Sequence, residues 1–493
     1  MSWACPYKGY KPAARRAVGC ALALLLALAG SSRAAAEEAP YPAITFDGND
    51  RILVLAPHPD DEILGCGGVI QQARDMGLPL KIVFLTYGDN NQWSFLVYRK
   101  HPVLMPGAAL EMGLVRYREA RQAAAVLGIP PDDLVFLGYP DYRTLEIWRS
   151  HWGDAPAARS MLTDVRAVPY DNALRPHAPY KGEEILKDLE AVITDFRPTK
   201  IFLSHPADHN ADHQALYLFT RVALWDLGGG AAPVLYPYLI HFRNWPVSRG
   251  YLPDRDEDAP AGLENAVFWR RFGLSPEETV SNRRAIEKHR SQIRSSRKYL
   301  LSFIRADEIF GDFPQVSLRE FRSPLNLSRH SPAYLGALPE ELIEEEKVLF
   351  VGIEEEFLTL EDGALVFTLK LSRPVSGKVR LSLAAFGYRS DRPFGRMPKI
   401  RVVLRKNSHK VYDQGRTLAS SRITVDRTPR RIDIRIPLEV LGDPQRILTS
   451  ARTYMGLVPL DWVEWRVLVV GERAAGGGVS PLKEAGGGAG GNS

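Results

Sequence analysis

The chain has 493 residues, of which 45% are hydrophobic and 25% are charged, fractions typical of a globular protein with two or three domains. Its 63 lysines and arginines exceed its 58 acidic residues by five. Residues 1–36 contain five basic residues and no acidic one, so residues 37–493 carry no formal net charge. This balance argues against the basic surface of a nucleic-acid-binding protein.

Residues 1–36 predict a cleaved signal peptide. Basic residues up to Arg16 precede an apolar run over residues 17–30, and small residues follow, with cleavage expected at Ala34–Ala36. The run is shorter than the about 20 residues that a membrane-spanning helix needs. We therefore expect an exported protein, periplasmic or extracellular, with no transmembrane segment after signal cleavage.

Residues 48–311 predict an α/β domain. Short apolar runs suit strands buried on both faces of a sheet: 51–56, 80–86, 134–138 and 200–204. Helical patterns lie between them, the clearest being an apolar stripe over residues 183–197. The alternation predicts a Rossmann-like, doubly wound, mostly parallel sheet with right-handed crossovers.

Two further segments of this domain depart from the simple alternation. Residues 139–182 are rich in proline and aromatic residues, which predicts an irregular insertion bordering a site. Trp148, Trp152 and Tyr180 in this insertion suit either stacking on a sugar or packing in the core. A single long helix over residues 276–304 is expected to close the domain.

A linker over residues 312–346 leads to a region with a different pattern. Apolar and polar residues alternate along about seven short segments between residues 347 and 471, as in half-buried antiparallel strands. This predicts a C-terminal antiparallel β-sandwich domain, which suits either glycan binding or a structural lid. The glycine-rich residues 472–493 predict a disordered tail.

Two of the predicted strands end in clusters of histidine and aspartate. The first is followed by PHPDDE at residues 57–62, and the fourth by HPADHNADH at residues 205–213. Ligands bind at the carboxyl ends of strands in an open parallel sheet. One turn can aim His58 and Asp61 at a common point, and a histidine of the second cluster would add a third ligand. Three protein ligands plus water form an open zinc site, although two histidines and a carboxylate also suit iron.

These motifs resemble those of the PIG-L/LmbE-like family of metal-dependent N-deacetylases, which act on N-acetyl amino sugars. The resemblance extends over residues 50–310 and includes further motifs: TYGD at 86–89, RxxEA at 116–120, LG at 127–128, FLGYPD at 136–141 and SQ at 291–292. It implies that His58, Asp61 and His213 bind Zn²⁺, with Fe²⁺ as the alternative metal. It also implies that Asp60 is the general base.

The resemblance assigns supporting roles to other residues. Arg116 matches an arginine that contacts substrate in family members, and a solvated helix residue paired with Glu119 is the alternative. Asp89 suits either substrate binding or a turn after Gly88. Asp212 is expected to orient a histidine next to the metal.

One position departs from the family pattern. Many members have a histidine where this chain has Asn210, and that histidine stabilises the oxyanion. Asparagine can donate a hydrogen bond to an oxyanion but cannot act as an acid. The acid role then falls to His209 or His205, unless Asp60 returns its own proton to the leaving amine.

The expected function is that of a secreted zinc-dependent N-deacetylase, a carbon–nitrogen amide hydrolase. Its partner would be an N-acetylated sugar of an envelope or extracellular polysaccharide or glycoconjugate, and not a nucleic acid. The neutrality of residues 37–493 favours an uncharged or weakly charged sugar. The alternative suggested by Asn210 is a catalytically impaired glycan-binding protein of the same fold, and a third possibility is another metal hydrolase or a non-haem iron site.

Overall fold

The computed structural model describes residues 41–90, 105–228, 232–318, 324–327, 344–419, 422–456 and 458–470. The predicted signal peptide and the predicted tail lie outside the described residues, so both stay predictions. No helix within these described ranges is long and apolar enough to cross a membrane. From Ala43 onward, the described residues belong to one compact unit.

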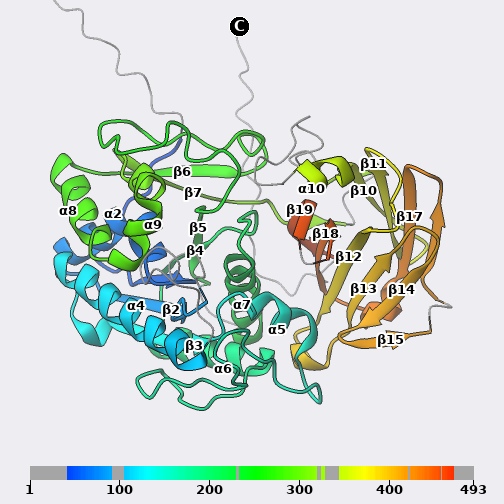
Figure 1. Ribbon diagram of the computed structural model, residues 1–493, viewed down its shortest axis with the longest axis horizontal. Helices are drawn as coiled ribbons and strands as arrows, with labels where there is room; N and C mark the ends of the chain where they lie inside the picture. Colours follow the sequence, from blue (N-terminus) through cyan, green and yellow to red (C-terminus); the bar gives the residue numbers. More distant parts are fainter. Residues whose placement is uncertain are drawn as a thin grey trace, which may run out of the picture. The chain divides into compact units, whose positions relative to one another are not determined.

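A five-stranded sheet lies at the centre of the N-terminal domain (Figure 1). Its order is β3-β2-β1-β4-β5, and the strands are Leu134–Tyr139, Leu80–Thr86, Ile52–Ala56, Lys200–Ser204 and Val234–Tyr238. All neighbouring strands are parallel, which confirms the predicted doubly wound sheet. Since the chain adds β2 and β3 on one side of β1 and then β4 on the other, the topological switch point lies between β1 and β4.

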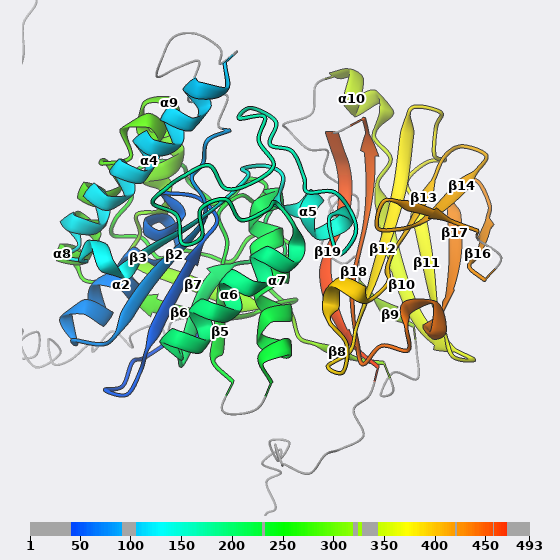
Figure 2. The ribbon, with the colours of Figure 1, turned by 90° about the horizontal axis from the view of Figure 1, so that it is seen from below.

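Helices cover both faces of this sheet (Figure 2). One face carries α2 and α4, and the other carries α6 and α7, as right-handed crossovers on either side of the switch point require. The bounds of these helices are Asp61–Asp75, Pro106–Val126, Gly182–Phe196 and Ala211–Leu227. All five residues of β1 are buried, because the strand has helices on both faces.

The predicted single helix over residues 276–304 is wrong. Two helices occupy the segment, α8 at Pro276–Ile286 and α9 at Arg290–Leu300, and a short 3₁₀ turn follows. His289, between the two helices, has non-helical angles of φ −75° and ψ 62°. Its buried ring lies near the Glu62 carboxylate, with 3.4 Å between Nε2 and Oε1. The helix is interrupted between α8 and α9, where His289 makes this tertiary contact. The local helical pattern does not reveal the interruption.

An antiparallel pair of strands that was not predicted stabilises the first helix. Strands β6, Phe268–Gly273, and β7, Asp307–Asp312, pair with each other. Glu308 of β7 accepts hydrogen bonds from the backbone N–H groups of Gly68 and Val69 at 2.7 and 3.2 Å. Helix α2 is kinked at Cys66, where φ is −145°, and the glutamate satisfies donors that the kink releases.

The C-terminal region contains two mostly antiparallel sheets that share one apolar core, which confirms the predicted sandwich. The five-stranded sheet has the order β16-β17-β11-β10-β9, with strands Thr424–Arg427, Arg431–Pro437, Ala364–Leu371, Ile353–Glu361 and Leu325–Asn326. The seven-stranded sheet has the order β15-β14-β13-β12-β18-β19-β8, with strands Arg416–Leu418, His409–Asp413, Lys399–Leu404, Val379–Tyr388, Arg446–Met455, Val458–Val469 and Val316–Ser317. Strands β8 and β9 lie within the stretch predicted to be a linker, which also contains part of helix α10, Glu344–Leu349.

The aromatic insertion packs in the core. Helix α5, Thr144–Ser150, lies within it, and Trp148, Trp152 and Tyr180 are at most 1% exposed. The rings of Trp148 and Trp152 lie 5.0 and 5.1 Å from Phe394 of the β-rich region, measured between centroids. Of the two roles that the sequence left open for these residues, core packing is the one observed, and the two tryptophans join the insertion to the sandwich.

Candidate metal centre

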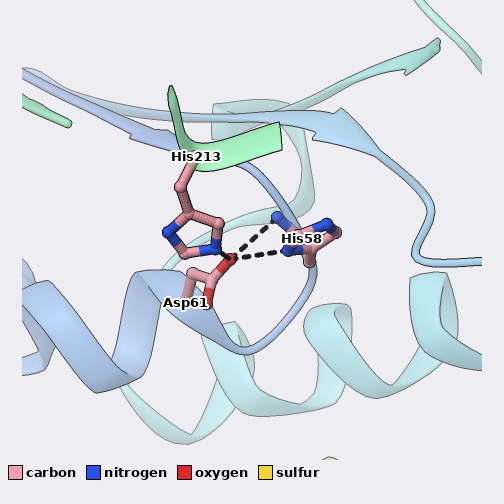
Figure 3. Close-up of side chains that lie close together, drawn as sticks. All are labelled: His58, Asp61 and His213. Atoms are coloured by element: carbon pink, nitrogen blue, oxygen red, sulfur yellow. Dashed lines mark hydrogen bonds and ion pairs between the residues drawn. The ribbon is translucent and has the colours of Figure 1, made fainter. Parts of the chain in front are cut away.

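His58, Asp61 and His213 lie together beside the switch point of the parallel sheet (Figure 3). Asp61 Oδ2 is 3.1 Å from His58 Nδ1 and 3.1 Å from His213 Nε2. All three side chains are buried, and their potential ligand atoms lie within 4.8 Å of one another. The structure therefore brings together the three residues that the sequence predicted as metal ligands.

The position of these residues follows from the local structure. His58 lies in the loop after β1, and Asp61 opens helix α2 and accepts a hydrogen bond from the His58 backbone N–H at 3.0 Å. His213 lies in the first turn of α7, which follows the neighbouring strand β4. Since both strands end at the same edge of the sheet, two motifs about 150 residues apart in sequence meet there.

The donor set fits a divalent metal. Two imidazoles and one carboxylate are a common ligand set for zinc and for iron. The His213 Nε2–Asp61 contact lacks hydrogen-bond geometry, and within the described part of the chain neither ring nitrogen of His213 has a hydrogen-bond partner. His58 Nδ1 and Asp61 Oδ2 are hydrogen-bonded to each other at 3.1 Å, whereas the ring nitrogens of His213 are left for a further partner such as a metal ion.

Carboxylates outnumber the two histidines here. Asp208 Oδ2 lies 3.0 Å from His213 Nδ1, and Asp141 and Asp212 lie 3.1 and 3.2 Å from His58 Nε2. Burial disfavours the charged form of His213, but attraction to Asp208 and Asp61 outweighs it and raises its pKa to about 9. This excess of negative charge favours a bound cation.

A second group of possible ligands is formed by His58, Asp141 and Asp212. Asp212 already accepts hydrogen bonds from the backbone N–H groups of Tyr142 and Thr144 at 2.5 and 3.1 Å, and another from the Thr144 hydroxyl. Its oxygens are therefore engaged, and it lies beside His58 as a group that orients the imidazole.

Asp60, the predicted general base, has an unusual backbone conformation. Its φ is 127°, which is rare for a residue with a side chain. Its N–H donates to Glu62 Oε2 at 2.8 Å, and the Arg116 guanidinium donates to Pro59 O at 2.6 Å and to Asp60 Oδ1 at 3.2 Å. Burial raises the pKa of Asp60 to about 7, an effect that the charge of Arg116 partly offsets. Such a carboxylate is suited to exchanging protons near neutrality.

A cavity of about 110 Å³ opens on this cluster. Its lining includes the predicted residues His58, Asp60, Asp61, Arg116 and Asn210. The remaining lining residues are Leu64, Asp141, Tyr142, His241, Gln292, Ser296, Tyr299 and Leu300. Its size suits a group of a few heavy atoms, with any larger part of a ligand extending outside.

Asn210 lies where it can donate into the cavity. As the N-cap of α7, its side-chain oxygen accepts the Asp212 N–H at 2.8 Å. This bond leaves the amide NH₂ group of Asn210 as its remaining donor. The structure thus places an uncharged donor at the cavity, and the role of Asn210 toward an oxyanion stays a prediction.

Five predicted residues do not line the cavity: the fully buried His213 and Asp212 described above, and also Asp89, His209 and His205. Asp89 accepts a hydrogen bond from Tyr170 at 2.7 Å. His209 packs against Phe242 and Trp462, and burial lowers its pKa to about 3. His205, which stacks on an indole ring, accepts a backbone hydrogen bond through Nδ1 at 3.0 Å. The structure therefore places neither histidine of the expected acid pair beside Asp60.

His241 is a cavity residue that the sequence analysis missed. Its ring lies 4.8 Å from that of His213, and its Nδ1 is 3.4 Å from the Tyr299 hydroxyl. Burial lowers the pKa of His241 to about 4, so the imidazole is neutral. It follows β5, whose sequence VLYPY lacks a strong strand pattern because it contains a proline. Recognising β5 as a strand from the sequence would have pointed to His241, because β5 lies parallel to β4 and both strands end at the same edge of the sheet.

Comparison with known proteins identifies relatives of the N-terminal domain. The model of the family described as "PIG-L: GlcNAc-PI de-N-acetylase" matches residues 53–224, which confirms the resemblance over this part of the chain. The 1D-myo-inositol 2-acetamido-2-deoxy-alpha-D-glucopyranoside deacetylase of Mycobacterium sp. (strain KMS) is 28% identical over 218 residues, 43% of this chain and 60% of that protein. A second relative is 1D-myo-inositol 2-acetamido-2-deoxy-alpha-D-glucopyranoside deacetylase 1 of Saccharopolyspora erythraea. It is 27% identical over 173 residues, 34% of this chain and 51% of that protein. The chain thus spans little more than half the length of these curated relatives.

Solved structures with partial similarity include the conserved protein TT1542 from Thermus thermophilus. It has 22% identity and a TM-score of 0.31, with 52% of this chain and 84% of that chain covered. The N,N'-diacetylchitobiose deacetylase from Pyrococcus horikoshii has 18% identity and a TM-score of 0.29, with coverage of 49% and 70%. Values this low support no inference about substrate.

Proposed function

We propose that this chain, whose residues 53–224 form a domain of the PIG-L family, is a metal-dependent hydrolase that removes acetyl groups from N-acetylated sugars. The observation that carries the proposal is the buried set of His58, Asp61 and His213, together with Asp60, which lines the small cavity beside His58 and Asp61. The names of the curated relatives, deacetylases of a 2-acetamido sugar, support the same reaction class.

The metal we propose is Zn²⁺, and Fe²⁺ suits the same ligands. Bound by His58, Asp61 and His213, it would polarise the acetyl carbonyl and lower the pKa of water. Asp141 and Asp212 hold His58 in orientation from its other ring nitrogen.

The protein's own groups handle the proton and the developing charge. Asp60 accepts a proton from the attacking water, and Arg116 holds its carboxylate toward the cavity. The Asn210 NH₂ group and the neutral His241 ring are donors for the tetrahedral oxyanion. When the carbon–nitrogen bond breaks, the proton on Asp60 passes to the amine, so that acetate and a free amino sugar leave.

Export completes the proposal. The basic, apolar and small-residue pattern of residues 1–36 supports a cleaved signal peptide, and hence a substrate outside the cytoplasm. Such a substrate would be an N-acetylated sugar of an envelope or extracellular polysaccharide or glycoconjugate.

Acetate release tests the proposed reaction. Purified protein, stripped with a chelator and reloaded with zinc or iron, should release acetate from N-acetylated oligosaccharides only when metal is present. Asp60→Asn is the matched control. It leaves all three ligands in place, so it should bind metal and yet release much less acetate. Metal-loaded protein that releases no acetate from any member of a broad panel would overturn the proposal.

The second candidate is a glycan-binding protein without activity, favoured by Asn210 in place of the family histidine. Oligosaccharide binding that survives His213→Ala, with no acetate released by the unmodified protein, would support this candidate. Loss of acetate release in the variant, from a protein that is otherwise active, would exclude it.

A further inference from the structure

A second cavity, of about 1080 Å³, adjoins the small one. Tyr142 and Asn210 line both cavities, so a single ligand can extend from one into the other. One wall of the large cavity comes from helix α5 and its neighbours, and the opposite wall comes from the seven-stranded sheet of the sandwich.

The large cavity is lined by arginine side chains. They come from helix α5 and the residue before it and from the outer face of the sheet: Arg143, Arg149, Arg380, Arg401, Arg405 and Arg452. Strand alternation explains the second group. The core residues Ile400, Val402 and Leu404 of β13 alternate with Arg401, Val403 and Arg405, which face outward.

This positive charge is poorly compensated. Glu146 and Glu464 are the only carboxylates among the described residues of the lining, and Glu146 is paired with Arg143. Within the described ranges of the chain, Arg149, Arg401 and Arg452 form no ion pair. Burial, together with repulsion from Arg452 and Arg401, lowers the pKa of Arg149 well below its usual range. Like charges brought together in a partly buried space destabilise the protein unless a ligand neutralises them.

Aromatic side chains accompany the arginines. The guanidinium of Arg401 lies 5.3 Å from the ring centre of Tyr412, and that of Arg452 lies 5.0 Å from the ring centre of Tyr454. Trp462 also lines the cavity. Aromatic rings offer flat apolar surfaces, and arginine binds carboxylate and sulfate groups through two parallel hydrogen bonds.

We propose that the large cavity binds the acidic portion of the substrate, a glycan in which the N-acetyl sugar is joined to sugars bearing carboxylate or sulfate groups. The N-acetyl group would enter the small cavity past Tyr142 and Asn210, while the anionic sugars lie against the arginines. The inference rests on the proposed deacetylase function. It replaces the uncharged sugar expected from overall composition, because the net charge of the chain conceals a local excess of positive charge.

Binding measurements on the full-length protein test the proposal. The probes are oligosaccharides that alternate N-acetylglucosamine with glucuronic acid, sulfated oligosaccharides of equal length, and neutral N-acetylglucosamine oligomers. We expect at least one acidic probe to bind about 10-fold or more tightly than the neutral one, and added salt to reduce this preference. The acidic probe that binds better distinguishes carboxylate from sulfate recognition.

The double variant Arg401→Gln/Arg452→Gln should weaken binding of the acidic probe about 10-fold and leave binding of the neutral probe unchanged. Arg416→Gln/Lys410→Gln is the matched control, because it removes the same charge from the same sheet outside the cavity. Arg380→Gln, at an exposed position, provides a second test if the half-buried Arg401 and Arg452 are needed for folding.

Three outcomes would overturn the proposal: equal affinity for acidic and neutral probes, no effect of the cavity variants, or tighter binding of single-stranded DNA than of any glycan. The proposed function fails separately. A protein that binds acidic glycans through these arginines but releases no acetate would retain this inference and lose the catalytic one. A protein that deacetylates neutral oligomers but shows no preference for acidic ones would retain the proposed catalytic function and lose this inference.

Discussion

The two adjoining cavities carry opposite charge. In the small one, Asp60, Asp61 and Asp141 lie close to the histidines, whereas arginines dominate the large one. Each concentration of like charge is costly in a partly buried space and calls for a counter-charge from outside the chain. The comparison indicates a cation for the small cavity and an anion for the large one, although residues 37–493 have no formal net charge.

Removing a metal ligand should have the largest effect on the small cavity. We expect His213→Ala to lose bound metal and to reduce acetate release by about 10³-fold or more, because two ligands form a much weaker site. Elemental analysis and acetate release measure the two effects. His409→Ala, on the sandwich and outside both cavities, should change neither. Metal content unchanged in His213→Ala would contradict the ligand assignment.

Asp60→Asn should separate metal binding from proton transfer. We expect the variant to retain its metal and to lose about 10²- to 10⁴-fold in kcat, since an amide cannot accept the proton. Measuring metal content beside kcat makes the result specific. A rate close to that of the unmodified protein would remove Asp60 from the mechanism.

Asn210 lies on the boundary between the cavities, and two substitutions separate its roles. Asn210→Asp can still cap α7 but has no NH₂ group, so we expect near-normal Tm and about 10²-fold lower kcat. Asn210→Ala should lose activity and also about 1 kcal/mol of stability. Equal kcat in Asn210→Asp and the unmodified protein would show that the amide donates nothing to the reaction.

The smallest expected effect concerns salt. Raising the ionic strength from about 0.01 M to about 1 M shortens the screening length from about 30 Å to about 3 Å. We expect KM for an acidic substrate to rise several-fold and kcat to change little, because we propose that the large cavity binds the acidic sugars and that the reaction takes place in the small one. A KM that rises equally for a neutral substrate would mean that salt acts elsewhere.

Much of the fold could be predicted from the sequence because the determining patterns are local. The bounds predicted for two parallel strands, 80–86 and 200–204, match β2 and β4, since a fully buried strand needs an unbroken apolar run. The alternation predicted between residues 347 and 471 is seen likewise in β11, Ala364–Leu371, whose burial alternates along most of the strand. His58, Asp61 and a histidine of the second cluster were also accessible as ligand candidates because their motifs directly follow strands, and the family resemblance singled out His213.

What the tertiary structure alone decided depends on contacts between distant segments. His241 lies beside His213 because β5 is the neighbour of β4, and the break at His289 accompanies a contact with Glu62, more than 200 residues away. The arginines of the large cavity come from separate strands and from α5, so no local window shows that they converge. The sequence by itself indicated His58, Asp60 and Asp61 as candidates for the small cavity and determined the overall neutrality of residues 37–493. Only the tertiary structure placed the carboxylates around the small cavity and the arginines around the large one. The local charge density depends on which side chains lie close together in space, and the number of charged residues in the sequence does not reveal this.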